Sequence, residues 1–292
     1  MAQKNVEFVM TPGEVHWVGD GFRVHNFIPS RFHLERERMD PFILLDYNSE
    51  YEFAPAPKPM GVGVHPHRGF ETVTIAYKGK VEHHDSYGGG GIIGEGDVQW
   101  MTAASGVLHK EFHEKEWSEQ GGLFQMVQLW INLPARFKMG HPRYQAIHNS
   151  EMVKVELPGN AGFVEVVAGE YEGKKGPAST FSPVNLMNAR LNKGGKAEFI
   201  FPANYNTALL VIKGGIFINK NEEAPVDHFV LFENRGESFE IEAIEEAVVL
   251  VMSGEPLNEP IVAHGPFVMN TKREIIQAFD DFNQGKFGYL KD

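Results

Sequence analysis

Two short groups of residues in this sequence have the types and spacing of a metal site. They are His65-Pro66-His67 and, later in the chain, His109-Lys110-Glu111. In each group the two outer side chains lie at i and i+2, which places them on the same face of an extended strand. Three imidazoles and a carboxylate suit Fe(II), Mn(II), Ni(II) or Zn(II), and a set without thiolates differs from a structural zinc cage. If both pairs point into one cavity, they form a mononuclear metal site at which chemistry can occur.

The elements that must position these side chains are strands. One His-x-His pair is a weak indication by itself, because the chain contains 13 His and most imidazoles in proteins bind no metal. The flanking sequence strengthens it, because strand-like runs separated by turns surround both pairs. These runs are residues 61–64, 71–77, 97–101 and 107–109, with turns at Lys78-Gly79 and Ser105-Gly106. We therefore predict hairpins that carry both pairs at the mouth of a barrel.

Longer stretches around these residues resemble the pirin family, a group of bicupin proteins. The spacing of His65, His67 and Glu71 is similar to the first cupin motif, and Gly106-x2-His109 is similar to the second. The runs that resemble pirins are HPHRGFET at 65–72, GDVQWMTA at 96–103, GVLH at 106–109 and GPFVMNT at 265–271. The resemblance covers most of the chain. It implies an all-β protein of two tandem cupin domains, which are jelly-roll β-barrels, with a short C-terminal helix.

The sequence departs from the general cupin pattern at two positions. Cupins commonly have Pro two residues before the second-motif Gly and Asn four residues after the His, where this chain has Ala104 and His113. In many cupins the carboxylate ligand is the first-motif Glu, here Glu71, whereas the resemblance to pirins implies Glu111. We follow the pirin pattern. The predicted metal ligands are therefore His65, His67, His109 and Glu111.

The roles of Glu71 and His113 stay open at this point. Glu71 either orients an imidazole as a hydrogen-bond partner or is simply a carboxylate at a strand end. His113 shares the strand parity of His109, but we expect it to lie past the strand, in the charged stretch 114–116.

Length and composition favour two β domains. The 292 residues exceed the usual limit of about 250 for a single core, and 31 Gly and 17 Pro separate short apolar runs. We predict an N-terminal, metal-binding cupin over residues 1–140 and a C-terminal cupin over residues 150–292. The boundary is expected in 134–149, where Pro142 and polar residues interrupt the strand pattern.

An internal repeat predicts that the second cupin binds no metal. The strand and turn that end at Gly79 recur at Gly214, and aligning these glycines places Ile200 opposite His65 and Pro202 opposite His67. The two isolated imidazoles of this half, those of His228 and His264, are not expected to bind metal.

Charge and cysteine content narrow the partners and the compartment. The net charge of −12 argues against direct binding to nucleic-acid phosphates. The chain has no Cys, no signal-peptide core follows Met1, and no apolar run reaches the roughly 18 residues that span a membrane. We expect a cytoplasmic protein that binds neither nucleic acid nor membrane.

Three further motifs have simpler interpretations. The run 88–91, four glycines, is expected to be a flexible hairpin loop rather than a phosphate-binding loop, because no Gly-Lys-Ser/Thr ending follows. In His83-His84-Asp85 adjacent side chains face opposite ways, so at most one imidazole could join the metal site, and we expect an exposed hairpin. Residues 271–274 have capping-box spacing and predict a helix that ends near Gly285. The resemblance implies that this C-terminal segment reaches back toward the first domain.

The predicted chemistry follows from coordination number. Four protein ligands on a six-coordinate metal leave two positions for a bidentate substrate, or for one substrate oxygen and dioxygen, whereas tetrahedral zinc would leave none. We expect one divalent metal ion, Fe(II) first and Ni, Mn or Zn as alternatives. The resemblance to pirins implies a quercetin 2,3-dioxygenase-like activity on a small phenolic or enolic substrate and O2. If Glu111 is a loosely held ligand, it is the best-placed general base for the hydroxyl proton.

The resemblance also implies a function of a different class. Other pirins look like non-enzymatic, iron-binding and redox-responsive regulators, and in that case the acidic chain would face a basic surface of a protein partner. A metal that only braces the barrel is a third interpretation. Turnover distinguishes the enzyme from the regulator, which predicts an oxidation-dependent change in partner affinity instead.

Overall fold

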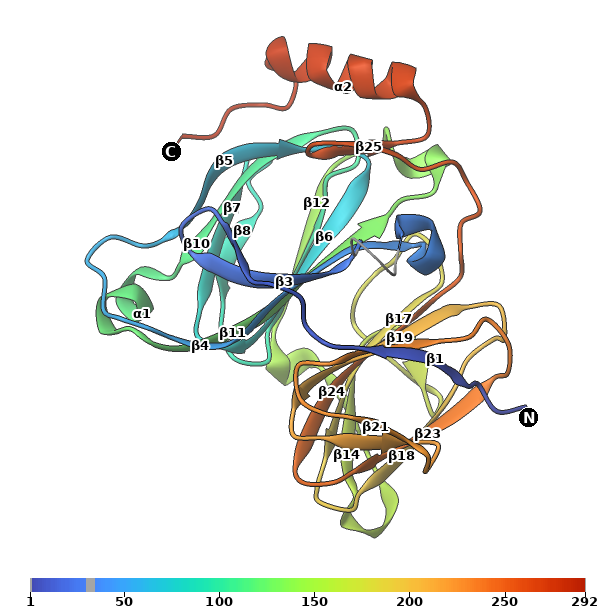
Figure 1. Cartoon of the computed structure of the whole chain (residues 1–292). Coiled ribbons are helices and arrows are strands. Elements are labelled where there is room, and N and C mark those ends of the chain that lie inside the picture. Colours follow the sequence, from blue (N-terminus) through green and yellow to red (C-terminus); the bar gives the residue numbers. More distant parts are fainter. Residues whose placement is uncertain (1, 30–34, 292) are drawn as a thin grey trace. The chain divides into compact units, whose positions relative to one another are not determined.

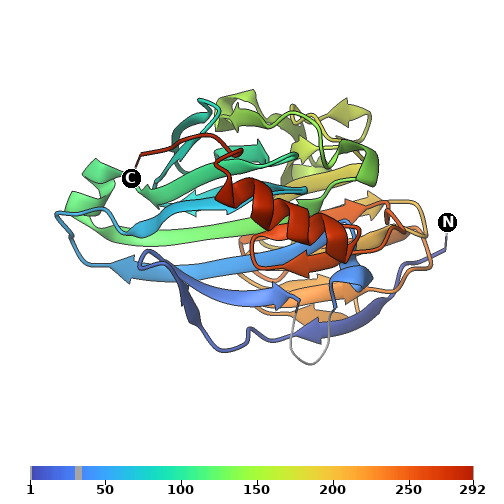
Figure 2. The same cartoon turned by 90° about the horizontal axis from the view of Figure 1, so that it is seen from above.

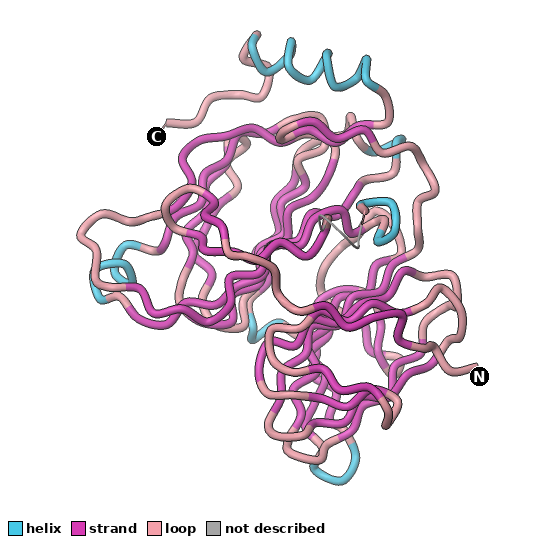
Figure 3. The backbone as a smooth tube through the Cα atoms, viewed as in Figure 1, coloured by secondary structure: helices cyan, strands magenta, loops and turns pink. Residues whose placement is uncertain are grey.

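The chain folds into two compact units built mainly of strands. The computed structural model describes residues 2–29 and 35–291. The first unit comprises Glu14–Glu37, Pro41–Asn149 and Leu257–Asp292, and the second comprises Met1–Gly13, Arg38–Asp40 and Ser150–Pro256. Strands dominate both units, and a short helix lies near the C-terminus (Figures 1 and 3). The predicted all-β class with a C-terminal helix is confirmed.

Two sheets share the core of the first unit. Its strands are β2 (His16–Val18), β3 (Phe22–Ile28), β4 (Phe42–Phe53), β5 (Gly61–His67), β6 (Phe70–Lys78), β7 (Val81–Asp85), β8 (Gly90–Ile93), β9 (Val98–Thr102), β10 (Val107–His113), β11 (Gly122–Asn132), β12 (Arg143–Ile147), β25 (Val262–His264) and β26 (Phe267–Met269). The larger sheet has the order β12-β9-β6-β11-β4-β3-β2 and the smaller has the order β5-β10-β7-β8. Val81 and Ile93 of the smaller sheet pack with Ala76 and Phe124 of the larger, because alternate side chains of each strand point inward.

The second unit repeats this plan. Its strands are β1 (Val6–Met10), β13 (Val153–Glu156), β14 (Gly162–Ala168), β15 (Glu170–Tyr171), β16 (Lys174–Lys175), β17 (Val184–Leu191), β18 (Lys196–Ile200), β19 (Asn206–Lys213), β20 (Ile216–Ile218), β21 (Glu222–Ala224), β22 (Phe229–Phe232), β23 (Ser238–Ala243) and β24 (Ala247–Gly254). Its sheets have the orders β1-β22-β19-β24-β17-β14-β13 and β18-β23-β20-β21. Sheets of seven and four strands thus recur in both units, in agreement with the internal repeat in the sequence.

The helices are short. They are α1 (Lys115–Gln120), α2 (Lys272–Asn283) and the 3-10 turns η1 (Arg36–Met39), η2 (Ala135–Phe137), η3 (Asn149–Glu151) and η4 (Pro158–Asn160). None of the helices in the described part of the chain has the length and apolar character needed to cross a bilayer.

The predicted domain ranges, 1–140 and 150–292, differ from the two units at both ends of the chain. Strand β1 pairs with β22 and so belongs to the second unit, where it takes the edge position that β12 takes in the first. Val6 and Val9 pack against the second core. In addition, β12 lies in the segment predicted as a boundary and pairs with β9. Sheet edges accept such remote strands because their backbone N–H and C=O groups need partners.

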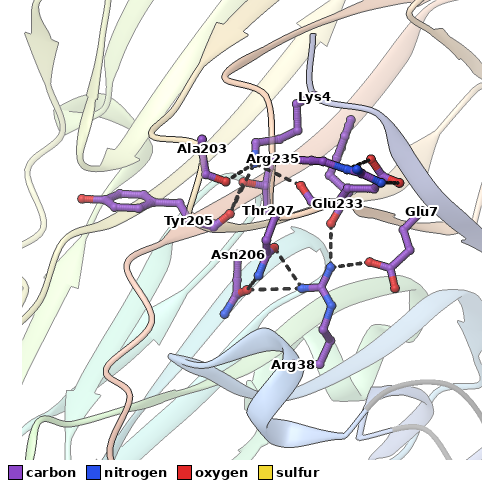
Figure 4. Close-up of polar contacts among 11 residues, drawn as sticks. Lys4, Glu7, Arg38, Ala203, Tyr205, Asn206, Thr207, Glu233 and Arg235 are labelled. Atoms are coloured by element: carbon purple, nitrogen blue, oxygen red, sulfur yellow. Dashed lines mark hydrogen bonds and ion pairs between the residues drawn. The ribbon is translucent and has the colours of Figure 1, made fainter. Parts of the chain in front are cut away.

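Buried polar contacts hold the N-terminal segment in the second unit (Figure 4). The buried Lys4 ammonium donates to the backbone carbonyls of Ala203, at 3.1 Å, and Glu233, at 3.2 Å. Nearby, Arg38 Nη2 donates to the Phe232 carbonyl at 2.8 Å and also pairs with Glu7. These contacts explain why residues 2–13 belong to this unit.

The C-terminal segment belongs to the first unit. The predicted capping box is confirmed, because the Thr271 hydroxyl accepts from the backbone N–H of Glu274 at the start of α2. Buried side chains of α2, including Ile275 and Ala278, pack with Phe267 of β26 and Leu108 of β10. Figure 2 shows α2 lying across strands of this unit. The implied return of this segment toward the first domain is therefore observed.

Candidate metal centre

Three neighbouring strands of the smaller sheet in the first unit bring the predicted residues to one face. Antiparallel pairing places His109 of β10 opposite His65 of β5 on one side and opposite Asp85 of β7 on the other. Two residues along β10, Glu111 lies opposite His83. Directly paired residues face the same side of a sheet, so this register gathers the side chains. The register shifts between His109 and Glu111, where β5 is irregular.

The three imidazoles predicted as ligands lie together. The ring centroids are 4.1 Å apart for His65 and His109, 4.8 Å for His67 and His109, and 4.9 Å for His65 and His67. One ring nitrogen of each lies within 4.8 Å of the others. His67 and His109 are buried, whereas His65 is half-buried and is the member of the cluster that solvent reaches. Parity along the strands thus predicted this grouping.

Backbone carbonyls fix the rings of His65 and His67. Nδ1 of His65 lies 2.8 Å from the Gly63 carbonyl oxygen, and Nδ1 of His67 lies 3.3 Å from the Pro266 carbonyl oxygen. A carbonyl oxygen only accepts, so Nδ1 carries a hydrogen in both rings, and in a neutral imidazole this leaves the lone pair on Nε2. Pro266 belongs to the C-terminal segment, a contribution that spacing within the two motifs could not reveal.

Burial keeps two of these imidazoles neutral. Burial, with the neighbouring His65, lowers the pKa of His67 to about 3. The same causes, with further contributions from His67 and His83, hold the pKa of His109 well below its ordinary value. A neutral imidazole is the form that binds a metal ion. Nε2 of His109 is moreover buried without a hydrogen-bond partner in the described structure, as expected for an atom that needs a ligand.

The Glu111 carboxylate lies in a second, overlapping group with His83 and His109. It accepts hydrogen bonds from the side-chain amide of Gln128, at 2.8 Å, and from that of Gln99. Burial alone would raise the pKa of Glu111, but the contacts with His83 and Gln128 outweigh it and lower the pKa. The carboxylate is therefore ionised and firmly held.

His83 corrects an expectation from the sequence. The run His83-His84-Asp85 was expected to form an exposed hairpin, but His83 and Asp85 are buried and only His84 is exposed. The His83 ring stacks on Tyr144, with centroids 5.1 Å apart and an interplanar angle of 19°. Burial alone would lower the pKa of His83, but the contacts with Asp85 and Glu111 outweigh it and raise the pKa. Strand parity allowed only one imidazole of His83 and His84 to face the site. The pairing of β7 with β10 shows that this imidazole is the one of His83.

Glu71 and His113 lie in other environments. The Glu71 carboxylate accepts a hydrogen bond from the Thr102 hydroxyl at 2.7 Å, and burial raises its pKa to about 7. His113 was expected past the strand, but it is the last residue of β10 and is buried. Its Nε2 donates to the Gly21 carbonyl at 2.8 Å, and its ring lies 4.7 Å from that of Phe53. The charged stretch after it begins α1, because Glu114 caps that helix.

The corresponding sheet of the second unit is packed with apolar side chains. Strands β18 and β23 hold the positions that β5 and β10 hold in the first unit. Phe199 and Phe239 stack there, with ring centroids 5.3 Å apart, and Ile241 packs in the same core. In the described ranges, the groups of side chains that could hold a metal ion all lie in the first unit.

Comparison with known families agrees with this architecture. The Pirin family model matches residues 21–131, and the model of the pirin C-terminal cupin domain matches residues 186–288. The chain belongs to the pirin family. The bicupin fold follows, with the three-imidazole cluster in the first cupin.

Individual relatives extend the comparison over the whole chain. A Pseudomonas aeruginosa protein named "Putative quercetin 2,3-dioxygenase PA2418" is 46% identical over 93% of this chain and 94% of its own length. The crystal structure of a quercetin 2,3-dioxygenase from Acinetobacter baumannii is 47% identical, with a TM-score of 0.93 over 99% of this chain and 100% of its own. The Escherichia coli pirin YhhW, solved in complex with nickel(II), is 19% identical with a TM-score of 0.65 over 85% of this chain and 99% of its own, which supports the fold alone.

Proposed function

We propose that this pirin is a mononuclear, metal-dependent dioxygenase whose metal ligands are His65, His67, His109 and Glu111. The observation that carries the proposal is the set of three clustered imidazoles, two of which have their Nδ1 atoms bonded to backbone carbonyls. The third contributes a buried Nε2 without a hydrogen-bond partner among the described residues. These donors fit a divalent metal ion.

The donor set favours a metal that accepts more than four ligands. Neutral imidazoles and one ionised carboxylate suit Fe(II), which we propose as the working metal, with Ni, Mn or Zn as alternatives. When bound, such an ion would stabilise an enolate or phenolate oxygen as a Lewis acid and would support reaction with O2.

The protein supplies a general base and a group of aromatic side chains beside the imidazole cluster. Glu111 is the proposed acceptor of the substrate hydroxyl proton, because it is the ionised carboxylate beside the imidazole cluster. The rings of Trp130 and Phe70 stack on each other, 4.2 Å apart, and the His67 ring lies 5.1 Å from Trp130. These rings flank His67 on its buried side, and we propose that a small molecule enters from the side of the half-buried His65.

The proposed substrate is a small phenolic or enolic compound of the flavonol type, with O2. The names of the Pseudomonas aeruginosa relative and the Acinetobacter baumannii structure support this choice, since both share nearly half of their residues with this chain. An aromatic substrate is also compatible with the rings that line the cluster.

Oxygen uptake with quercetin tests the proposal. The protein is reconstituted with Fe(II) without oxygen, and in parallel with Ni, Mn and Zn, and a His65→Ala variant serves as the control. We expect O2 uptake that matches loss of quercetin and is absent in the variant. Stoichiometric metal loading without uptake for any metal would contradict the enzyme and favour the redox-responsive regulator that acts through a protein partner.

The role of Glu111 has its own test. Glu111→Gln should reduce turnover more than metal content, because the amide keeps the shape but accepts no proton. Glu82→Gln on the neighbouring strand β7 is the matched control, since Glu82 bonds the exposed His84 instead. Equal losses of turnover and metal in Glu111→Gln would remove the base role and leave a ligand.

A further inference from the structure

The imidazole of His109 differs from the other two in the partner of its Nδ1 atom. His65 and His67 each direct Nδ1 at a backbone carbonyl, those of Gly63 and Pro266. Nδ1 of His109 instead lies 3.4 Å from Nδ1 of His83. An imidazole can donate or accept at this atom, so the hydrogen between the two rings belongs either to His109 or to His83.

One arrangement of hydrogens is compatible with a metal ion at His109. A ligand imidazole presents a lone pair to the metal and commonly donates its other N–H to a neighbouring group. For His109 to present Nε2, as the carbonyl contacts imply for His65 and His67, its Nδ1 must carry the hydrogen and donate to His83. Nδ1 of His83 must then accept, which places the hydrogen of His83 on Nε2.

Asp85 faces that nitrogen. Oδ2 of Asp85 lies 3.8 Å from Nε2 of His83. Its other oxygen accepts from the backbone N–H groups of Tyr87, at 2.8 Å, and Gly89, at 2.9 Å, which anchors the carboxylate at the end of β7. The stacked Tyr144 ring restricts rotation of His83. Oε1 of Glu111 lies 3.8 Å from Nδ1 of His83, and Nδ1 of His109 lies closer to that nitrogen, at 3.4 Å.

We propose that His83, backed by Asp85, is a positioning residue that holds the hydrogen of His109 on Nδ1 and so presents Nε2 to the metal. His83 does for His109 what the Gly63 and Pro266 carbonyls do for the other two rings. The proposal rests on the proposed ligand role of His109, and it adds two residues outside the four ligands to the metal centre.

A matched pair of substitutions tests this role. His83→Gln keeps an acceptor oxygen near Nδ1 of His109, whereas His83→Met fills a similar volume without a strong acceptor. His84→Met introduces the same residue on the exposed face of β7 and is the control. Zn(II) affinity is measured by chelator competition, and the tautomer of His109 is read from the nitrogen shifts of the Zn(II)-loaded protein by NMR.

We expect His83→Met to weaken Zn(II) binding roughly 10- to 100-fold, the usual effect of losing such an outer partner. His83→Gln should recover most of this loss, and His84→Met should bind as the wild type does. His109 should carry its hydrogen on Nδ1 in the wild type. Equal affinities of His83→Met and His83→Gln would overturn the proposal, as would a hydrogen on Nε2 of His109.

The readouts separate this proposal from the proposed function. Neither Zn(II) affinity nor the tautomer requires turnover, so an inactive protein still gives a result. A His109→Ala variant that binds Zn(II) as the wild type does would show that His109 is no ligand, and the role of His83 would fall with it. If His109→Ala loses the metal but His83→Met does not, the ligand assignment stands and the positioning role alone is wrong.

Discussion

Replacing Asp281 with Asn should weaken the attachment of the C-terminal segment to the strand that carries His65 and His67. The Arg68 guanidinium, one residue after His67, donates to the Asp281 carboxylate at 2.9 Å, and the two side chains are only 4% and 9% exposed. The same arginine donates to the Ser105 carbonyl at 2.7 Å, and its backbone carbonyl accepts from Val268 at 3.0 Å. Through these contacts it holds the segment whose Pro266 carbonyl orients His67.

The size of the effect follows from burial. At an effective dielectric constant near 20, unit charges 2.9 Å apart attract by about 6 kcal/mol, and the cost of removing both ions from water offsets a large part of this. Removing only one partner leaves the other charge buried, which usually costs about 3–5 kcal/mol. Asn retains an acceptor oxygen, so we expect the lower value, about 3 kcal/mol, and a melting temperature lower by roughly 6–12 °C.

Calorimetry of the metal-free protein measures this change. Lys286→Met is the matched control, because Lys286 binds the other oxygen of Asp281 at 2.7 Å but is 55% exposed. That variant should lose less than about 1 kcal/mol. The Asp281→Asn variant should also bind Zn(II) about 10-fold more weakly, since the carbonyl that orients His67 is released. Equal melting temperatures for the two variants would refute the reasoning.

Three further predictions concern other buried groups. Burial raises the pKa of the Glu71 carboxyl from 4.5 to about 7, so its contribution to stability is complete below pH 4.5 and is lost as the pH rises through about 7. The melting temperature should therefore fall over this range, and Glu71→Gln should flatten the fall. An unchanged pH profile in the variant would count against this role of Glu71. Burial, with the charge of Arg38, lowers the pKa of the Lys4 ammonium from 10.5 to about 8. The unfolded chain therefore binds more protons than the folded protein between these pH values, and the free energy of unfolding rises with pH there. Lys4→Met should abolish this rise in denaturant titrations at several pH values, and a rise that persists in the variant would exclude Lys4 as its cause. Gly69 has φ +92° and an added Cβ would lie 1.9 Å from the Val268 carbonyl oxygen, so Gly69→Ala should increase hydrogen exchange in β26, and wild-type protection there would contradict this.

Local patterns predicted the strands and the C-terminal helix well. The predicted strand 71–77 lies within β6, and the capping box at Thr271 starts α2. These features depend on side chains close together in the sequence, so the sequence alone reveals the strand periodicity and the helix cap. The grouping of His65, His67 and His109 was predicted for the same reason, because parity fixes the face of a strand.

Partners far apart in the sequence could not be predicted. Nothing in residues 6–10 specifies that β1 pairs with β22, and the polar character of β12 concealed its strand. His83 was misplaced because strand parity does not say which face is buried until the neighbouring strand is known. Pairing with Glu111 supplies that information. The carbonyl of Pro266 reaches His67 only through the return of the C-terminal segment, which a pattern within one motif does not contain.

The fate of isotopically labelled dioxygen tests the central claim most directly. The Fe(II)-loaded protein is supplied with quercetin under 18O2, and the mass of the ring-cleavage product is determined by mass spectrometry, with His65→Ala as the control. The account predicts that both oxygen atoms of one O2 molecule enter the product and that the variant forms none. Product that carries one labelled atom or none, or equal product from the variant, would contradict a dioxygenase at this centre.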